Sequence, residues 1–154
     1  MDRWSKRVVT GLAADFGGSA VLPFGGPPYS PFIAWALRSG RVWASPINML
    51  VHDGAGLFLS FRGALCLPYQ LDQPSPLPDK PCNTCAAKPC KAACPVNALG
   101  PEGYDLETCH GYLDTPAGQD CMKNGCAVRR ACPVSQKYAR LSEQSAHHMK
   151  AFHP

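Results

Sequence analysis

The sequence lacks the features that mark several common classes of protein. No apolar run approaches the ~20 residues of a membrane-spanning helix, so we expect no membrane span. The net charge is only +4 and no segment concentrates lysine and arginine, so we expect no nucleic-acid binding. The basic start of residues 1–20 is not followed by the apolar stretch and cleavage site of a secretory signal. The glycines of Gly25-Gly26-Pro27-Pro28 lack the Lys-Ser/Thr of a phosphate-binding loop.

Proline, glycine and cysteine are abundant instead. The 154 residues include 16 prolines and 14 glycines, which predicts a loop-rich chain with short helices and strands. Residues 68–81 hold five of the prolines, so we expect an extended, stiff linker there. The predicted fold class is α+β, with a small α/β lobe at residues 1–67, the linker at 68–81 and a cysteine-rich domain at 82–154.

Hydrophobic periodicity predicts the main elements of the lobe. Apolar residues recur every four positions in residues 3–16, as in an amphipathic helix, and residues 32–38 form a second short helix. Residues 41–51 and 57–67 are predicted to be the two strands of one hairpin, because Asp53-Gly54 lies in the short connection between them. Cys66, on the second strand, is expected to be a small buried thiol.

Eight of the nine cysteines lie between positions 82 and 132. The first four are separated by two, four and three residues, and the fourth is followed by Pro95. A single cysteine follows, and the last three are separated by four and five residues and end at Pro133. We expect one helix from about residue 134 to the C-terminus, because Val134, Tyr138, Leu141, Ser145, Met149 and Phe152 form one stripe.

Four chemistries use cysteines in such numbers. Disulfides suit small secreted chains, and zinc takes four thiolate or imidazole ligands, so eight cysteines suffice for two ions. A catalytic nucleophile needs one thiolate and a base. An iron–sulfur cluster is held by three closely spaced cysteines and a distant one, which is often followed by proline because proline turns the chain away. The spacing favours two [4Fe–4S] clusters, with zinc and disulfides as alternatives, and so many free thiols indicate a reducing cytoplasm.

The cysteine-rich segment resembles the dicluster ferredoxin fold. It is most similar to the C-terminal iron–sulfur half of the epoxyqueuosine reductase and reductive dehalogenase group. Cys109-His110-Gly111-Tyr112-Leu113 stands where that group has a ligand in a C-(I/V)-(S/A)-Y-L-like stretch. Gly125-Cys126 and Cys132-Pro133 match its G-C…C-P ending. The chain departs from bacterial ferredoxins in the four residues between Cys85 and Cys90, where they have two.

The resemblance implies a set of ligands and a function. In dicluster ferredoxins each cysteine motif lends its last ligand to the other cluster. One cluster would therefore be held by Cys82, Cys85, Cys90 and Cys132, and the other by Cys94, Cys109, Cys121 and Cys126. The implied function is one-electron transfer, with Tyr104, Leu106 and Leu99 shielding the clusters from water. Arg129 and Arg130 lie on a solvated face or form a docking patch for an acidic redox partner protein.

Two other functions compete with the electron carrier. Residues 32–68 follow the order of elements that precedes the clusters in epoxyqueuosine-reductase-like enzymes, which bind cobalamin on a larger α/β domain. Only some 80 residues precede Cys82, so the alternative to the carrier is a fragment or relative of such a cobalamin-dependent enzyme. Only Asp2 matches the family's catalytic Asp-Tyr-His stretch, and we therefore assign no catalytic residue. A zinc-stabilised interaction module is the third hypothesis. His147, His148 and His153 lack metal-ligand spacing and are expected to be solvated. His110, next to Cys109, is expected to have a structural or surface role.

Overall fold

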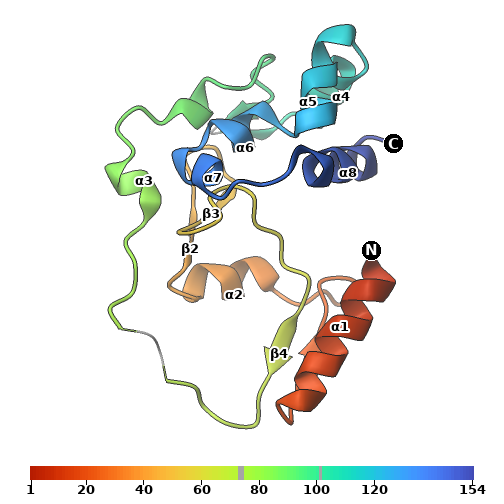
Figure 1. The fold of residues 1–154 in the computed structure, drawn as a ribbon, viewed down its shortest axis with the longest axis vertical. Helices are drawn as coiled ribbons and strands as arrows, with labels where there is room; N and C mark the ends of the chain where they lie inside the picture. Colours follow the sequence, from red (N-terminus) through yellow and green to blue (C-terminus); the bar gives the residue numbers. More distant parts are fainter. Residues whose placement is uncertain (73–74, 101) are drawn as a thin grey trace. The chain divides into compact units, whose positions relative to one another are not determined.

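The computed structural model describes residues 1–72, 75–100 and 102–154 (Figure 1). The chain combines short helices with two-stranded antiparallel sheets, which confirms the mixed α+β class in this coarse form. Pro74 of the expected linker and Pro101 lie outside the described residues. The chain divides into two compact units, residues 1–39 with 60–77 and residues 40–59 with 78–154.

The first unit contains two helices and one small sheet. Helices α1 (Asp2–Asp15) and α2 (Phe32–Arg38) confirm the two helices expected from periodicity. Strand β1 (Ser19–Val21) pairs with β4 (Ala64–Cys66). Arg62 ties the end of this sheet to α1, because its guanidinium donates to the buried Ser5 hydroxyl at 3.0 Å and to the Asp2 carboxylate at 2.8 Å. Asp2 is therefore held in an ion pair.

The second unit contains the remaining elements. Strand β2 (Val42–Ala44) pairs with β3 (Leu50–His52), and β5 (Leu99–Gly100) pairs with β6 (Gly103–Tyr104). The helices are α3 (Pro81–Thr84), the 3-10 helix η1 (Pro89–Lys91), α4 (Leu106–Leu113), the 3-10 helix η2 (Pro116–Gly118), α5 (Gln119–Asn124), α6 (Ala127–Ala131), α7 (Pro133–Lys137) and α8 (Ser142–Phe152).

The predicted hairpin between residues 41–51 and 57–67 is wrong. Residues 41–51 fold back on themselves as β2 and β3, because Pro46 has no N–H to continue a ladder and Asn48 takes a left-handed φ of 59°. Strand β4 pairs instead with β1. The turn at Asp53-Gly54 does form, but it closes only a single bridge between His52 and Gly56.

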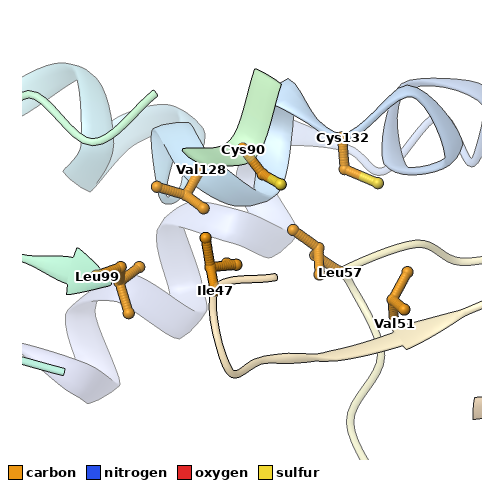
Figure 2. Close-up of a cluster of buried hydrophobic side chains, with 7 residues drawn as sticks. All are labelled: Ile47, Val51, Leu57, Cys90, Leu99, Val128 and Cys132. Carbon is orange, nitrogen blue, oxygen red and sulfur yellow. The ribbon is translucent and has the colours of Figure 1, made fainter. Parts of the chain in front are cut away.

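The β2–β3 hairpin belongs with the cysteine-rich region. Figure 2 shows Ile47, Val51 and Leu57 packed with residues from the other part of the second unit. The complete core consists of Ile47, Val51, Leu57, Cys90, Leu99, Val128 and Cys132. The compact units therefore divide the expected lobe of residues 1–67, because the apolar side chains of residues 40–59 are buried against the cysteine-rich segment.

The prediction of a single C-terminal helix from about residue 134 is also wrong. It is two helices, α7 and α8, separated at residues 138–141, where Ala139 takes a left-handed φ of 52°. The turn lets α8 fold onto α5. Gly125 permits this approach, because a Cβ there would lie 2.7 Å from the Cβ of Ser145, and its own φ is 87°.

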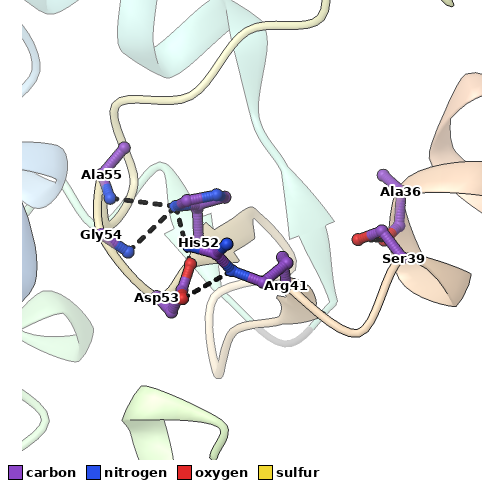
Figure 3. Close-up of polar contacts among 7 residues, drawn as sticks. All are labelled: Ala36, Ser39, Arg41, His52, Asp53, Gly54 and Ala55. Carbon is purple, nitrogen blue, oxygen red and sulfur yellow. Dashed lines mark hydrogen bonds and ion pairs between the residues drawn. The ribbon is translucent and has the colours of Figure 1, made fainter. Parts of the chain in front are cut away.

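The turn after β3 is held by side-chain bonds (Figure 3). Nδ1 of His52 accepts the backbone N–H groups of Gly54 at 2.9 Å and Ala55 at 3.1 Å. The Asp53 carboxylate accepts from Arg41 Nε at 2.7 Å. Burial raises the pKa of Asp53, but the hydrogen bond and charge of Arg41, the charge of His52 and the Gly54 amide together lower it below its ordinary value.

Removing the Arg41–Asp53 ion pair is expected to have a small effect that is the same at pH 7 and pH 6. A double-mutant cycle with Arg41→Gln and Asp53→Asn should give a coupling of about 0.5–1 kcal/mol, since Arg41 is 46% exposed. A carboxylate with a lowered pKa stabilises the fold above the unfolded pKa of ~3.9 and loses this effect as pH falls through the folded pKa. Urea unfolding of anaerobic protein should therefore give equal coupling at pH 7 and pH 6. A coupling that vanishes by pH 6 would contradict this account.

Candidate metal centres

Four cysteines, here called the first thiol group, gather around the start of α7. They are Cys82, Cys85, Cys90 and Cys132. Burial raises the pKa of Cys90 most, and the charges of Cys132, Cys82 and Cys85 raise it further. The pKa of Cys82 is raised by burial, lowered by Lys80, and raised again by Cys132 and Cys85. These four sulfur atoms therefore lie within electrostatic range of one another.

The other four, the second thiol group, gather between α4, α5 and α6. They are Cys94, Cys109, Cys121 and Cys126. The pKa of Cys109 is raised by burial, lowered by a hydrogen bond from Tyr104, and raised by Cys94 and Cys121. Burial raises the pKa of Cys121, and Cys126 raises it further. These four cysteines thus lie within electrostatic range of neighbours in the same set, and the division into two ligand sets stays a prediction.

Backbone geometry explains how the first thiol group converges. Pro81 begins α3, which carries Cys82, and Cys85 follows directly after that helix. Lys88 takes a left-handed φ of 42° and redirects the chain into η1, where Cys90 is buried. Cys132 is extended and precedes Pro133, whose fixed φ suits the first turn of α7.

The first thiol group lines a pocket of ≈ 400 Å³. The opposite wall is apolar and comes partly from Val51 and Leu57, on and after the β2–β3 hairpin. Leu57 is fixed there because its backbone N–H donates to the buried Ser135 hydroxyl at 2.8 Å, three residues after Cys132. Ser135, which binds the chain just after the hairpin, and Cys132, which supplies a thiol, thus lie in one continuous segment.

The cysteines of the second thiol group come from three helices or their ends and from a turn. Cys109 lies on α4, whose N-terminus is capped by Asp105, since its carboxylate accepts the Thr108 N–H at 3.0 Å. Cys121 lies on α5 and Cys126 immediately precedes α6. The segment after Cys94 forms a turn, with Asn97 at a left-handed φ of 52°.

Hydrogen-bond donors point at three sulfur atoms of this group. The N–H of Ala98 donates to Cys94 Sγ at 3.2 Å, and the phenol of Tyr104 donates to Cys109 Sγ at 3.1 Å. A backbone hydrogen bond from Ala127 lowers the pKa of Cys121. Donors to sulfur stabilise the thiolate form, which is the form that binds metal.

The predicted insulating residues differ in their exposure. Leu99 is buried in the core with Cys90 and Cys132. Tyr104, which contacts Cys109 Sγ, is 41% exposed and shields it only in part, and Leu106 is 52% exposed. Burial and its hydrogen bond to Cys109 raise the pKa of Tyr104, and the phenol is therefore protonated at neutral pH.

Cys66 stands apart from both groups. It lies on β4 of the first unit, whereas the other eight cysteines lie in the second. Its side chain is exposed, and the expected burial is therefore wrong. The strand pairs with β1, and the partner of Cys66 across the ladder is Ser19, which is also exposed.

Arg129 and Arg130 make internal contacts. The Arg129 guanidinium donates to the Leu57 carbonyl at 2.8 Å, which joins α6 to the segment after the hairpin. Arg130 donates to the Gly125 carbonyl at 2.9 Å and forms an ion pair with Asp120. Both arginines therefore have structural roles beside the thiol groups, and docking of a partner there stays a prediction.

Sequence reasoning missed a cluster of side chains beside Cys109. His153 contacts His110 through their Nδ1 atoms at 2.9 Å, and its Nε2 lies 2.9 Å from the Asp114 carboxylate. Phe152 stacks on Tyr104 with ring centroids 6.1 Å apart. The contact gives His110 a structural role, which was one of the two roles expected for it. The solvated state expected for His153 is wrong, because its side chain is 17% exposed, and no local spacing signals a contact between positions 43 residues apart.

The chemistry of the donor set can be compared with the needs of a metal ion and of an iron–sulfur cluster. Among the side chains that the structure describes, no group of three or more histidine, cysteine, aspartate or glutamate residues is arranged to hold one metal ion. A cubane cluster has a different requirement, because each of four thiolates binds its own iron atom of a shared inorganic core. Two sets of four thiols, with donors to sulfur in one and a pocket at the other, offer the ligand type and number that two such clusters would take.

Comparisons of the chain with protein-family models, curated proteins and solved structures found no match. Within residues 1–72, 75–100 and 102–154, none of the helices has both the length and the apolar character needed to cross a bilayer.

Proposed function

We propose that this protein is an electron carrier with two [4Fe–4S] clusters, one on each thiol group. The single observation that carries the proposal is that Cys82, Cys85 and Cys90 line one pocket together with Cys132, which lies far from them in the sequence. Each cluster accepts or donates one electron, and the protein sets its potential through thiolate ligation, hydrogen bonds to sulfur and burial.

The composition of each set supports a dicluster ferredoxin-like arrangement. Cys132 closes the first thiol group although it follows the second cysteine motif, and Cys94 joins the second group although it ends the first motif. Such an exchange of the fourth ligand is the rule in two-cluster ferredoxins. In this arrangement the two clusters lie in one compact unit, residues 40–59 with 78–154.

The remaining features of the proposal follow from this chemistry. Reduced thiols suit the cytoplasm, where we place the protein. A carrier needs a redox partner protein, and the chemistry alone does not specify its identity. We propose no catalytic residue: Asp2, which would be the acid in a cobalamin-dependent relative, is paired with Arg62.

Anaerobic purification followed by iron and acid-labile sulfide analysis tests the proposal. We expect about eight irons and about eight sulfides per chain, a brown colour, and a paramagnetic signal after reduction with dithionite. Stoichiometric zinc without sulfide would instead support the zinc-stabilised module. Micromolar or tighter binding of cobalamin by the same sample would replace the carrier with the enzyme hypothesis.

A further inference from the structure

Tyr104 makes the one contact between a side-chain hydroxyl and a cysteine sulfur that we find in the described part of the chain. Its phenol donates to Cys109 Sγ at 3.1 Å, whereas the donors to Cys94 and Cys121 are the backbone amides of Ala98 and Ala127. A backbone donor is fixed by the fold, but a phenol reaches a sulfur only if its ring is held in position. The packing of the ring therefore determines whether this hydrogen bond persists.

The C-terminal end of α8 holds the Tyr104 ring. Phe152 stacks on it with an interplanar angle of 13°, and the same Phe152 ring meets His110 edge-on with centroids 4.7 Å apart. The next residue, His153, is anchored at both ring nitrogens, by His110 and by Asp114. Two residues at the end of the chain thus fix an aromatic ring over the second thiol group.

We propose that Tyr104 raises the reduction potential of the cluster on the second thiol group and that Phe152 is its positioning residue. The inference rests on the proposed function. Reduction adds one electron to the cluster, with no covalent bond made or broken and no proton transferred. The added negative charge is shared with the thiolate sulfurs, and a hydrogen bond to sulfur therefore stabilises the reduced state more than the oxidised state.

A redox titration of Tyr104→Phe tests the proposal. The substitution removes the hydroxyl and keeps the ring that packs on Phe152. We expect the equilibrium constant for reduction of one cluster to fall about three- to tenfold, at about 59 mV per tenfold for a one-electron couple. The other cluster should keep its potential, and iron and sulfide content should equal that of the wild type.

Tyr112→Phe is the matched control. Tyr112 lies on α4 three residues after Cys109, and its phenol donates to the Ala117 carbonyl at 2.9 Å rather than to sulfur. This variant should leave both potentials unchanged. Phe152→Ala should lower the same potential as Tyr104→Phe, and adding Phe152→Ala to Tyr104→Phe should cause no further fall, because the hydrogen bond is already absent.

The outcomes separate the inference from the proposed function. A fall in one potential, confined to Tyr104→Phe and Phe152→Ala, supports the inference. Unchanged potentials in Tyr104→Phe, equal shifts of both clusters, or loss of iron from that variant would overturn it and leave the two-cluster carrier standing. A wild-type chain that takes up no iron and sulfide would overturn the proposed function and this inference with it.

Discussion

Alanine at Cys90 is expected to remove one cluster and halve the iron content, from about eight to about four atoms per chain. Cys90 is 9% exposed and lies in the core that contacts the first thiol group. The first thiol group has no fifth cysteine to replace Cys90, since the other four cysteines of the second unit belong to the second thiol group. Iron and sulfide analysis of the anaerobic variant is the measurement.

Double variants test the division into groups more sharply than single ones. Cys90→Ala with Cys132→Ala should still retain about four irons, because both residues belong to the first thiol group. Cys90→Ala with Cys94→Ala should lose nearly all iron, although these cysteines are close neighbours in sequence, because they belong to different groups. If neighbours in sequence shared a cluster, the Cys90/Cys94 double variant would keep more iron than the Cys90/Cys132 variant; the proposed groups predict the reverse.

Cys66→Ala is the matched control for these variants. It removes an exposed thiol from the first unit, and the iron content should stay at the wild-type value. Equal iron loss from the two double variants would contradict the assignment of Cys94 and Cys132. Iron loss from Cys66→Ala would show that the ninth cysteine is a ligand.

Gly56→Ala is expected to be the most destabilising substitution outside the cysteines. Gly56 has a left-handed φ of 58°, which costs alanine about 1 kcal/mol or more. Its new Cβ would overlap the Ser135 backbone nitrogen and lie 2.5 Å from the Ser135 hydroxyl oxygen. The buried hydrogen bond from Leu57 would then open, so we expect a total loss of about 2–4 kcal/mol in unfolding free energy.

Gly54→Ala in the same turn provides the control for Gly56→Ala. A Cβ at Gly54 would come no closer than 3.6 Å to the His52 ring, which is ordinary van der Waals contact. Denaturant unfolding of anaerobic protein should separate the two variants clearly. Gly56→Ala should also release iron faster on exposure to a chelator, because Ser135 follows Cys132 closely. Equal stability of the two variants would contradict the proposed contact between the hairpin and α7.

Local sequence patterns predicted the elements whose determinants are local. The four-residue recurrence of apolar side chains gave α1, and Phe32–Arg38 was predicted with its observed bounds. The hairpin was mispredicted because strand propensity does not specify pairing: Pro46 and Asn48 make a turn inside the first predicted strand. The left-handed Ala139 that divides α7 from α8 has no sequence signal, because alanine favours helices.

The candidate site was predictable to a similar extent. Cysteine spacing and the prolines after Cys94 and Cys132 indicated candidate ligands, and the resemblance implied their division into two groups; that these thiols bind clusters stays a prediction. The contacts that surround them depend on distant segments. Leu57 N–H reaches Ser135 across 78 positions, and His153 meets His110 only because α8 folds back. Such contacts follow from packing, so no window of the sequence contains them.

Native mass spectrometry of the anaerobically purified chain tests the central claim most directly. It measures intact stoichiometry and distinguishes iron–sulfur clusters, zinc and disulfides in a single spectrum. The account predicts one dominant species whose mass exceeds that of the 154-residue chain by two Fe₄S₄ units. A dominant species carrying two zinc ions, or one whose mass is lowered only by the hydrogens lost in disulfide formation, would contradict it.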